Sequence, residues 1–222
     1  MNGKIINNND RIILAGIASF TIIVVAAIWF LSNTASRTGN STAAAPEPPD
    51  SMASHHTGGG RAATAILDAL VGKTVPDFTL TDRDGKAYSK DNLQGKKVVL
   101  FFNEGLMCYP ACWNQIAELA SDSRLNNKDT IVLSVVVDPV KEWQRAVDKM
   151  PELARATVVF DTNREVSGKL GLLTTPSSMH YGSLPGHSYV IIDRDGTVRH
   201  VYDDPTMAIH NDQLIDELAK LP

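Results

Sequence analysis

The two cysteines of this chain are the residues whose type and spacing point most directly to chemistry. Cys108 and Cys112 lie four positions apart in FFNEGLMCYPACWNQI, where an apolar run gives way to a helical pattern. Residues four apart on a helix face the same way, so the two sulfurs are expected close together. Such a pair suits a structural disulfide, a thiol–disulfide couple or a soft-metal clamp, and the spacing alone leaves all three open.

The position of the pair favours redox chemistry. A disulfide that closes so short a loop removes little chain entropy and stabilises weakly. A helix N-terminus favours a thiolate, so Cys108, just ahead of the first turn, is predicted to be the exposed nucleophile, with Cys112 resolving its mixed disulfide. Trp113 is expected to pack beside this loop. Glu104 is a candidate proton acceptor near Cys108, with a solvated loop carboxylate as the alternative.

Strand and helix patterns alternate along the segment that must position the cysteines. Short apolar or alternating runs predict strands, joined in two places by Asp-Gly hairpin turns, within 77–89, 96–102, 130–137, 157–160 and 187–203. Helical patterns are expected at 62–72, 111–120, 140–150, 163–173 and 211–221. This order predicts an α/β fold with a mixed sheet and helices on both faces.

An uncharged apolar segment lies near the N-terminus. Residues 12–31 are long enough to cross a hydrocarbon core of about 30 Å, and no small-residue cleavage site follows closely. We expect an uncleaved membrane anchor, with a cleaved signal peptide or a buried core helix as alternatives. Lys4 and Arg11 precede the span and only Arg37 follows it closely, which predicts a short cytoplasmic N-terminus, residues 1–11, and an exported remainder.

A tether is expected between this span and the folded domain. Residues 32–61 are rich in Ser, Thr, Ala, Pro and Gly, a composition that cannot bury enough apolar surface to fold. Within it, Met52, His55 and His56 form a candidate soft-metal cluster, or solvated linker side chains. The folded domain is then residues 62–222. The net charge of −4 and the lack of a basic run argue against a nucleic-acid partner.

Residues 71–119, VGKTVPDFTLTDRDGKAYSKDNLQGKKVVLFFNEGLMCYPACWNQIAEL, resemble the opening of thioredoxin-fold redoxins of the AhpC/TSA, peroxiredoxin-like type and of membrane-anchored thioredoxins. LSVVVDP and HSYVIIDRDGTVRHVY are similar to later strands of the same family. The resemblance covers roughly residues 70–220. It implies a thioredoxin fold with Cys108 and Cys112 in the active loop, no required cofactor, and a disulfide partner or a peroxide as substrate.

Two details depart from the usual members of these families. Thioredoxins have one residue fewer between their cysteines. Peroxiredoxins precede the peroxidatic cysteine with Pro-x-x-x-Thr-x-x-Cys, whereas Phe101 and Gly105 stand at those positions before Cys108. Counted back from Cys112, the two positions hold Gly105 and Tyr109 instead.

The Cys-x-x-x-Cys spacing is itself similar to that of Sco-type copper chaperones and thiol reductases, which add a histidine at the start of a later strand. His187, followed by Ser188, has this position, and the resemblance implies that its ring lies beside Cys108 and Cys112. Two thiolates and an imidazole suit copper, and the imidazole would equally stabilise a thiolate. A histidine simply buried at a strand start is the alternative.

Three further side chains, Met107, Met179 and His180, are weaker candidates for soft ligands near this loop. Three functions are therefore carried forward. The first is a membrane-tethered, extracytoplasmic thiol–disulfide oxidoreductase that reduces disulfides or peroxides. The second is a copper carrier that uses the two cysteines and His187. The third is a redox-inert interaction domain with a thioredoxin fold.

Overall fold

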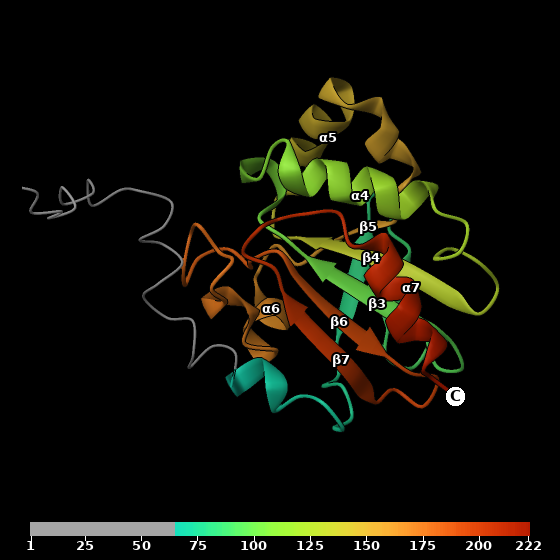
Figure 1. Cartoon of the computed structure of the whole chain (residues 1–222). Coiled ribbons are helices and arrows are strands. Elements are labelled where there is room, and N and C mark those ends of the chain that lie inside the picture. Colours follow the sequence, from blue (N-terminus) through green and yellow to red (C-terminus); the bar gives the residue numbers. More distant parts are fainter. Residues whose placement is uncertain (1–64) are drawn as a thin grey trace, which may run out of the picture. The chain divides into compact units, whose positions relative to one another are not determined.

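The structure, a computed structural model, describes residues 65–222 (Figure 1). The expected N-terminal segments 1–11, 12–31 and 32–61, with the candidate ligands Met52, His55 and His56, lie outside the described residues. Among residues 65–222, no helix combines the length and the apolar character that crossing a lipid bilayer requires.

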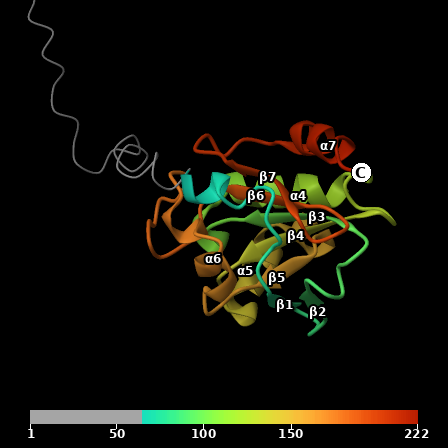
Figure 2. The same cartoon turned by 90° about the horizontal axis from the view of Figure 1, so that it is seen from below.

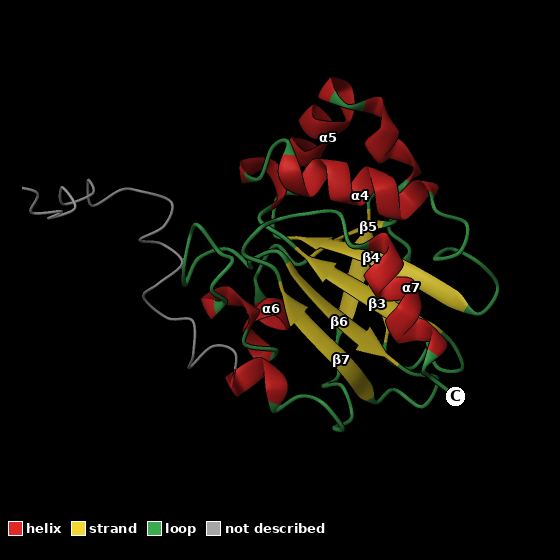
Figure 3. Cartoon of the chain, in the orientation of Figure 1, coloured by secondary structure: helices red, strands yellow, loops and turns green. Residues whose placement is uncertain are grey.

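One mixed sheet of seven strands carries the fold, in the order β2-β1-β5-β4-β3-β6-β7 (Figure 3). The central strand β3 pairs parallel with β4 and antiparallel with β6. The strands predicted from apolar runs and hairpin signals are confirmed, with the bounds β1 (Thr79–Asp82), β2 (Ala87–Ser89), β3 (Lys97–Phe102), β4 (Thr130–Val136), β5 (Val158–Phe160), β6 (Ser188–Ile192) and β7 (Val198–Asp203).

Helices cover both faces of this sheet, as the sequence predicts. The longer ones are α4 (Ala111–Ser121), α5 (Val140–Lys149) and α7 (Asn211–Ala219). The short ones are α6 (Glu165–Lys169) and three 3₁₀ turns, η1 (Gly105–Met107), η2 (Pro151–Arg155) and η3 (Leu172–Thr174). A further helical turn occupies residues 65–68, where a longer helix to Gly72 was expected.

Alternation along β3 divides the apolar interior into two cores. Val99 and Phe101 point into the core that α4, α5 and α7 close. Val98, Leu100 and Phe102 point into the other, closed by α6, η3 and the first helical turn. Figure 2 shows α4 and α7 on one side of the sheet and α6 on the other. Side chains alternate across a strand, so a strand buried on both faces needs the unbroken apolar run that β3 has.

The structure also contains turns that the sequence patterns did not predict. The predicted helix at 163–173 is split into α6 and η3, because Gly171 adopts a left-handed φ of 73° between them. Pro151 opens η2, which follows α5 directly. The turn η1 joins the end of β3 to the cysteines and is the piece that matters most for the site.

Two groups outside η1 hold it in place. The half-buried side chain of Asp138, which follows β4, accepts a hydrogen bond from the Leu106 N–H at 3.1 Å. The indole N–H of Trp113, on α4, donates to the Gly105 carbonyl at 2.9 Å. Gly105 has a φ of 58°, and a Cβ built on it would lie 1.7 Å from Asp138 Oδ2. The left-handed backbone and the close carboxylate both require glycine here.

This geometry predicts that Gly105→Ala lowers the free energy of unfolding by more than the cost of a left-handed φ at an alanine. The left-handed φ alone costs about 1–2 kcal/mol, and displacing Asp138 also leaves the Leu106 N–H without its partner, for a total of roughly 3 kcal/mol or more. Gly95→Ala is the matched control, because Gly95 has a φ of 84° with nothing within 4 Å of the added Cβ. Urea unfolding of the two variants measures the difference. Equal losses of stability would show that Asp138 does not constrain η1.

Candidate active site

The cysteines lie at the connection between the central strand β3 and the helix α4. β3 ends at Phe102, η1 follows, Cys108 is the residue after η1, and α4 begins at Ala111. The Cys112 N–H donates to the Cys108 carbonyl at 3.0 Å, which closes the turn between them. The predicted placement between strand and helix is confirmed. Cys108 precedes α4 and Cys112 lies inside its first turn, as expected.

The two sulfurs form a disulfide bond, and both are buried. Cys108 is only 2% exposed, so the prediction of an exposed nucleophile is wrong for this state. The sulfurs pack within the core beneath α4, and Met207, from the loop between β7 and α7, lies over Cys108 with its Sδ 3.8 Å from Cys108 Sγ. A sulfur bonded to another sulfur carries no charge and is readily buried.

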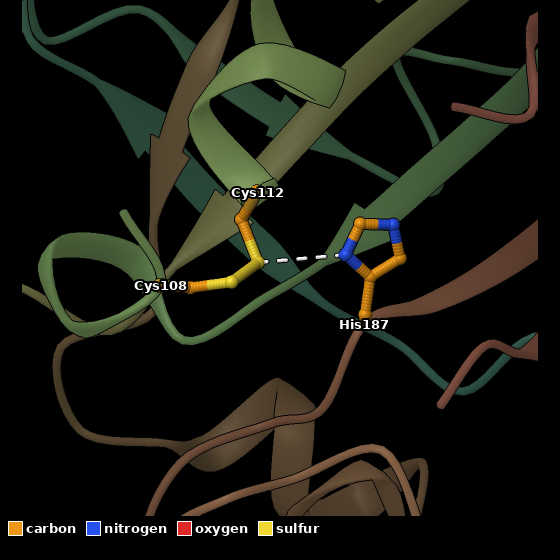
Figure 4. Close-up of side chains that lie close together, drawn as sticks. All are labelled: Cys108, Cys112 and His187. Carbon is orange, nitrogen blue, oxygen red and sulfur yellow. Dashed lines mark hydrogen bonds between the residues drawn. A yellow bond between two sulfur atoms is a disulfide. The ribbon is translucent and has the colours of Figure 1, made fainter. Parts of the chain in front are cut away.

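His187 lies directly beside the disulfide, as predicted (Figure 4). Its Nδ1 is 3.4 Å from Cys112 Sγ, and its Nε2 is 2.9 Å from the Tyr189 hydroxyl. The ring meets Phe101 edge-on, with 4.6 Å between ring centroids. His187 immediately precedes β6, and the pairing of Ser188 with Phe102 brings it to the end of β3 next to the cysteines.

Burial governs the charge of this imidazole. It lowers the pKa of His187 to about 4, against a smaller opposite effect of the nearby Asp204 carboxylate. The ring is therefore neutral at pH 7 and carries one proton. Burial also raises the pKa of Tyr189, so its hydroxyl stays protonated and keeps a hydrogen to donate.

Trp113 packs beside the active loop, as expected. Besides its bond to η1, its ring meets Tyr109 and Trp143 edge-on, at centroid distances of 4.9 and 6.2 Å. The ammonium of Lys149 lies 3.5 Å from the Tyr109 ring centroid. Tyr109 and Met107 are 52% and 58% exposed, so apolar side chains border Cys108 at the surface.

Glu104 has a different role from either one predicted. Its carboxylate is buried, and it accepts hydrogen bonds from the Ser178 hydroxyl at 3.1 Å and the His180 N–H at 2.9 Å. The His180 ring lies 3.2 Å from its other oxygen. These bonds tie the start of η1 to the loop between η3 and β6. The carboxylate is occupied by that loop, so it is neither solvated nor a proton acceptor for Cys108.

Among the described residues, one cluster of side chains could hold a metal ion. The ligand atoms of Cys108, Cys112 and His187 all lie within 4.8 Å of one another. Of the weaker candidates, Met107 is exposed and His180 is bonded to Glu104, so neither joins the cluster.

Met207 is the functional candidate that the sequence analysis missed. It has a left-handed φ of 52° and lies in a loop organised by Asp204, whose carboxylate accepts from the Thr206 N–H at 2.9 Å and the Ala208 N–H at 2.7 Å. The Asp204 N–H donates to the His187 carbonyl at 2.9 Å, and this hydrogen bond fixes the position of the loop relative to His187. Asp204-Pro205 signals a turn in the sequence, but nothing in it points the methionine at a cysteine.

Comparison with known proteins identifies the family. The AhpC/TSA family matches residues 71–201, more than half of the 222 residues. The peroxiredoxin Bcp of Escherichia coli is 29% identical over 152 residues, 67% of this chain and 95% of that protein. The chloroplastic peroxiredoxin Q of Sedum lineare is 28% identical over 155 residues, 68% of this chain and 76% of that protein.

Solved structures show the same thioredoxin-like α/β fold. AhpC of Enterococcus faecalis has a TM-score of 0.58 at 16% identity, covering 68% of this chain and 90% of that one. Peroxidoxin BcpB of Mycobacterium tuberculosis has a TM-score of 0.55 at 23% identity, covering 68% and 97%. The family match runs from the turns before β1 into β7 and encloses both cysteines and His187. This chain therefore belongs to the AhpC/TSA family.

Proposed function

We propose that this protein passes two electrons between its Cys108–Cys112 pair and a disulfide or dithiol of another molecule. Membership of the AhpC/TSA family makes the chain a peroxiredoxin-like, thiol-dependent oxidoreductase. The observation that carries the proposal is the intramolecular disulfide with a neutral imidazole 3.4 Å from one of its sulfurs. A pair used only for stability has no need of that imidazole, and a four-residue separation gives such a bridge little entropy to remove.

The cycle follows from thiol–disulfide exchange. In the reduced protein, the Cys108 thiolate attacks one sulfur of the substrate disulfide and forms a mixed disulfide, and the other substrate sulfur leaves as a thiolate. Cys112 then attacks the Cys108 sulfur, which releases the second substrate thiolate and forms the Cys108–Cys112 disulfide. Two electrons have passed to the substrate, and an external dithiol returns two to the protein.

The surroundings of Cys108 favour a disulfide over a peroxide as the substrate. Among the residues that the structure describes, the side-chain atom within hydrogen-bonding distance of its sulfur is the Met207 thioether, which cannot donate a hydrogen bond to a peroxide oxygen. Phe101 and Gly105 occupy the positions where the peroxiredoxin motif has Pro and Thr. The names of the relatives, peroxiredoxin Bcp and peroxiredoxin Q, make peroxide the alternative substrate.

A second function, copper binding, is favoured by one specific observation. Cys108, Cys112 and His187 offer ligand atoms within 4.8 Å of one another, and the Met207 thioether lies 3.8 Å from Cys108 Sγ. Once the disulfide is reduced, two thiolates, an imidazole and a thioether make a soft set that suits Cu(I).

Substitution of the two cysteines tests the main proposal through different outcomes. Cys108→Ser removes the attacking sulfur, so reduction of a disulfide substrate is expected to fall by about a hundredfold or more. Cys112→Ser keeps the attack but not the resolution, so it is expected to accumulate a mixed disulfide that mass spectrometry detects on Cys108. Full turnover by both variants would leave the redox-inert interaction domain as the better explanation. Faster turnover of hydrogen peroxide than of the disulfide would reverse the choice of substrate.

Metal titration of the reduced full-length chain under anaerobic conditions tests the copper alternative. One Cu(I) per chain is expected, with affinity falling at least tenfold in His187→Ala, because an imidazole ligand is lost. Met207→Leu should also weaken binding, whereas Met107→Leu should not, because Met107 points to solvent. Binding below one equivalent, or binding that Met107→Leu weakens equally, would exclude this site.

We also propose that residues 12–31 anchor the chain in a membrane with the cysteines on the extracytoplasmic side. The support is the apolar length of the segment and the cations that precede it. The full-length chain is expected in the membrane fraction after an alkaline carbonate wash, with its C-terminal part open to protease added outside the cytoplasm. Release by the wash would contradict the anchor, and protection from protease would contradict the orientation.

A further inference from the structure

Tyr189 lies behind His187, on the side away from the cysteines. The two rings are both fully buried, and the Tyr189 hydroxyl is 2.9 Å from His187 Nε2. Tyr189 stacks on Phe101 on one side, at a centroid distance of 4.7 Å, and on Tyr202 on the other, at 6.3 Å. Its hydroxyl is therefore held at the imidazole by packing as well as by the hydrogen bond.

Only one tautomer of His187 satisfies both of its neighbours. The Tyr189 hydroxyl has one hydrogen, and among the described residues Nε2 is the acceptor within its reach. If the hydroxyl donates to Nε2, the single ring proton must lie on Nδ1, where it points at Cys112 Sγ. The opposite tautomer would leave a buried hydroxyl hydrogen without an acceptor and would set the Nδ1 lone pair against a sulfur that has no hydrogen.

The other groups around the ring do not alter this choice. The Ala208 backbone, the Asp204 carboxylate and His210 also lie near the ring, but the hydrogen-bond contacts of its nitrogens within residues 65–222 are to Cys112 Sγ and the Tyr189 hydroxyl. The bond from the Asp204 N–H to the His187 carbonyl fixes the backbone beneath the ring. Phe101, edge-on to the ring, limits its rotation.

We propose that Tyr189 is a positioning residue that holds His187 in its Nδ1–H tautomer, so that His187 donates a hydrogen bond to Cys112 and makes Cys112 the sulfur that leaves when the disulfide is reduced. The inference rests on the proposed thiol–disulfide function and adds to it which sulfur is attacked. It also moves the site of thiolate stabilisation from Cys108, where the sequence analysis placed it, to Cys112.

The exchange step is then asymmetric. A thiolate of the reducing dithiol attacks Cys108 Sγ and forms a mixed disulfide, and the electron pair of the Cys108–Cys112 bond departs on Cys112 Sγ, which accepts the hydrogen bond from Nδ1–H. The second thiolate of the dithiol then attacks the first sulfur of the same dithiol, the one bound to Cys108. This forms the disulfide of the dithiol and releases the Cys108 thiolate. The dithiol has become a disulfide, and the protein has gained two electrons.

The surface around the pair agrees with this direction. Met107 and Tyr109, the neighbours of Cys108 along the chain, are exposed, so an incoming thiol approaches Cys108 from their side once Met207 moves. Cys112 lies deeper, in the first turn of α4 against His187. The sulfur nearer the surface is thus attacked, and the sulfur beside the hydrogen-bond donor leaves.

The tautomer can be measured directly on the full-length chain labelled with ¹⁵N-histidine. Long-range ¹H–¹⁵N correlations of His187 are expected to show a protonated Nδ1 and an unprotonated Nε2 at pH 7. Tyr189→Phe removes only the hydroxyl and is expected to let the proton redistribute between the two nitrogens. Tyr202→Phe is the matched control, because it removes a hydroxyl from the same aromatic stack without touching His187. A wild-type pattern with the proton on Nε2 would overturn the proposal.

Equilibration with dithiothreitol gives the functional readout. A smaller population of the donor tautomer destabilises the reduced protein, so Tyr189→Phe is expected to lower its equilibrium constant for reduction about two- to threefold, or about 9–14 mV in potential, while Tyr202→Phe leaves it unchanged. Rapid quenching with glutathione and an alkylating agent should place glutathione on Cys108 and the alkyl group on Cys112.

The failures are distinguishable. No exchange with any thiol in the wild type, with the disulfide intact, would refute the proposed function, whatever the tautomer. Normal exchange with equal potentials in wild type and Tyr189→Phe, or with glutathione on Cys112, would refute this inference and leave the function standing.

Discussion

The pairing of β3 with β6 is the constraint on which the site depends. The register that sets Phe102 opposite Ser188 also brings His187 to the end of β3, where η1 and α4 deliver the cysteines. Side chains alternate across a strand, so a slip of one residue would turn the imidazole to the far face of the sheet and leave the disulfide alone. The register is itself fixed by apolar side chains of both strands that fill the two cores. The chemistry of the site is thus set by packing that extends well beyond it.

Three carboxylates, two of them buried and that of Asp138 half-buried, hold the loops around that register. Glu104, Asp138 and Asp204 each accept at least one backbone N–H from a loop that borders the cysteines or His187. A buried carboxylate without partners is costly, so Glu104 and Asp204 are stable only while their loops keep the observed shape. The three therefore act as fixed points that bring η1, the loop before β6 and the loop before α7 to one place. A helix dipole or a short sequence motif would not give that precision.

The periodic parts of this fold were accessible from the sequence, and the loop contacts were not. The apolar run of β3 predicts a strand, and Asp195-Gly196 predicts a hairpin turn. Both predictions need only neighbouring residues, because side-chain patterning and turn chemistry are local. The partners of a buried carboxylate cannot be predicted in this way. Glu104, for example, binds Ser178 in a loop more than 70 residues further along the chain. The burial of Cys108 depends in the same way on Met207, 99 residues along the chain. His187 was found through family resemblance, since a histidine before a strand has no periodicity of its own.

Because the disulfide is buried, a thiol can reach it only after a local movement of the side chain that covers Cys108. The Cys108 sulfur is covered by one thioether from a short loop, and Met207 holds a left-handed backbone that costs a non-glycine residue about 1–2 kcal/mol. The hydrogen bonds to Asp204 on either side of Met207 offset that cost. Met207 packs against the core beneath α4 from a loop, so its side chain can move without displacing a strand or a helix. For the proposed exchange, the Met207 side chain must therefore leave Cys108 before a thiol reaches the sulfur from the side that Met107 and Tyr109 border.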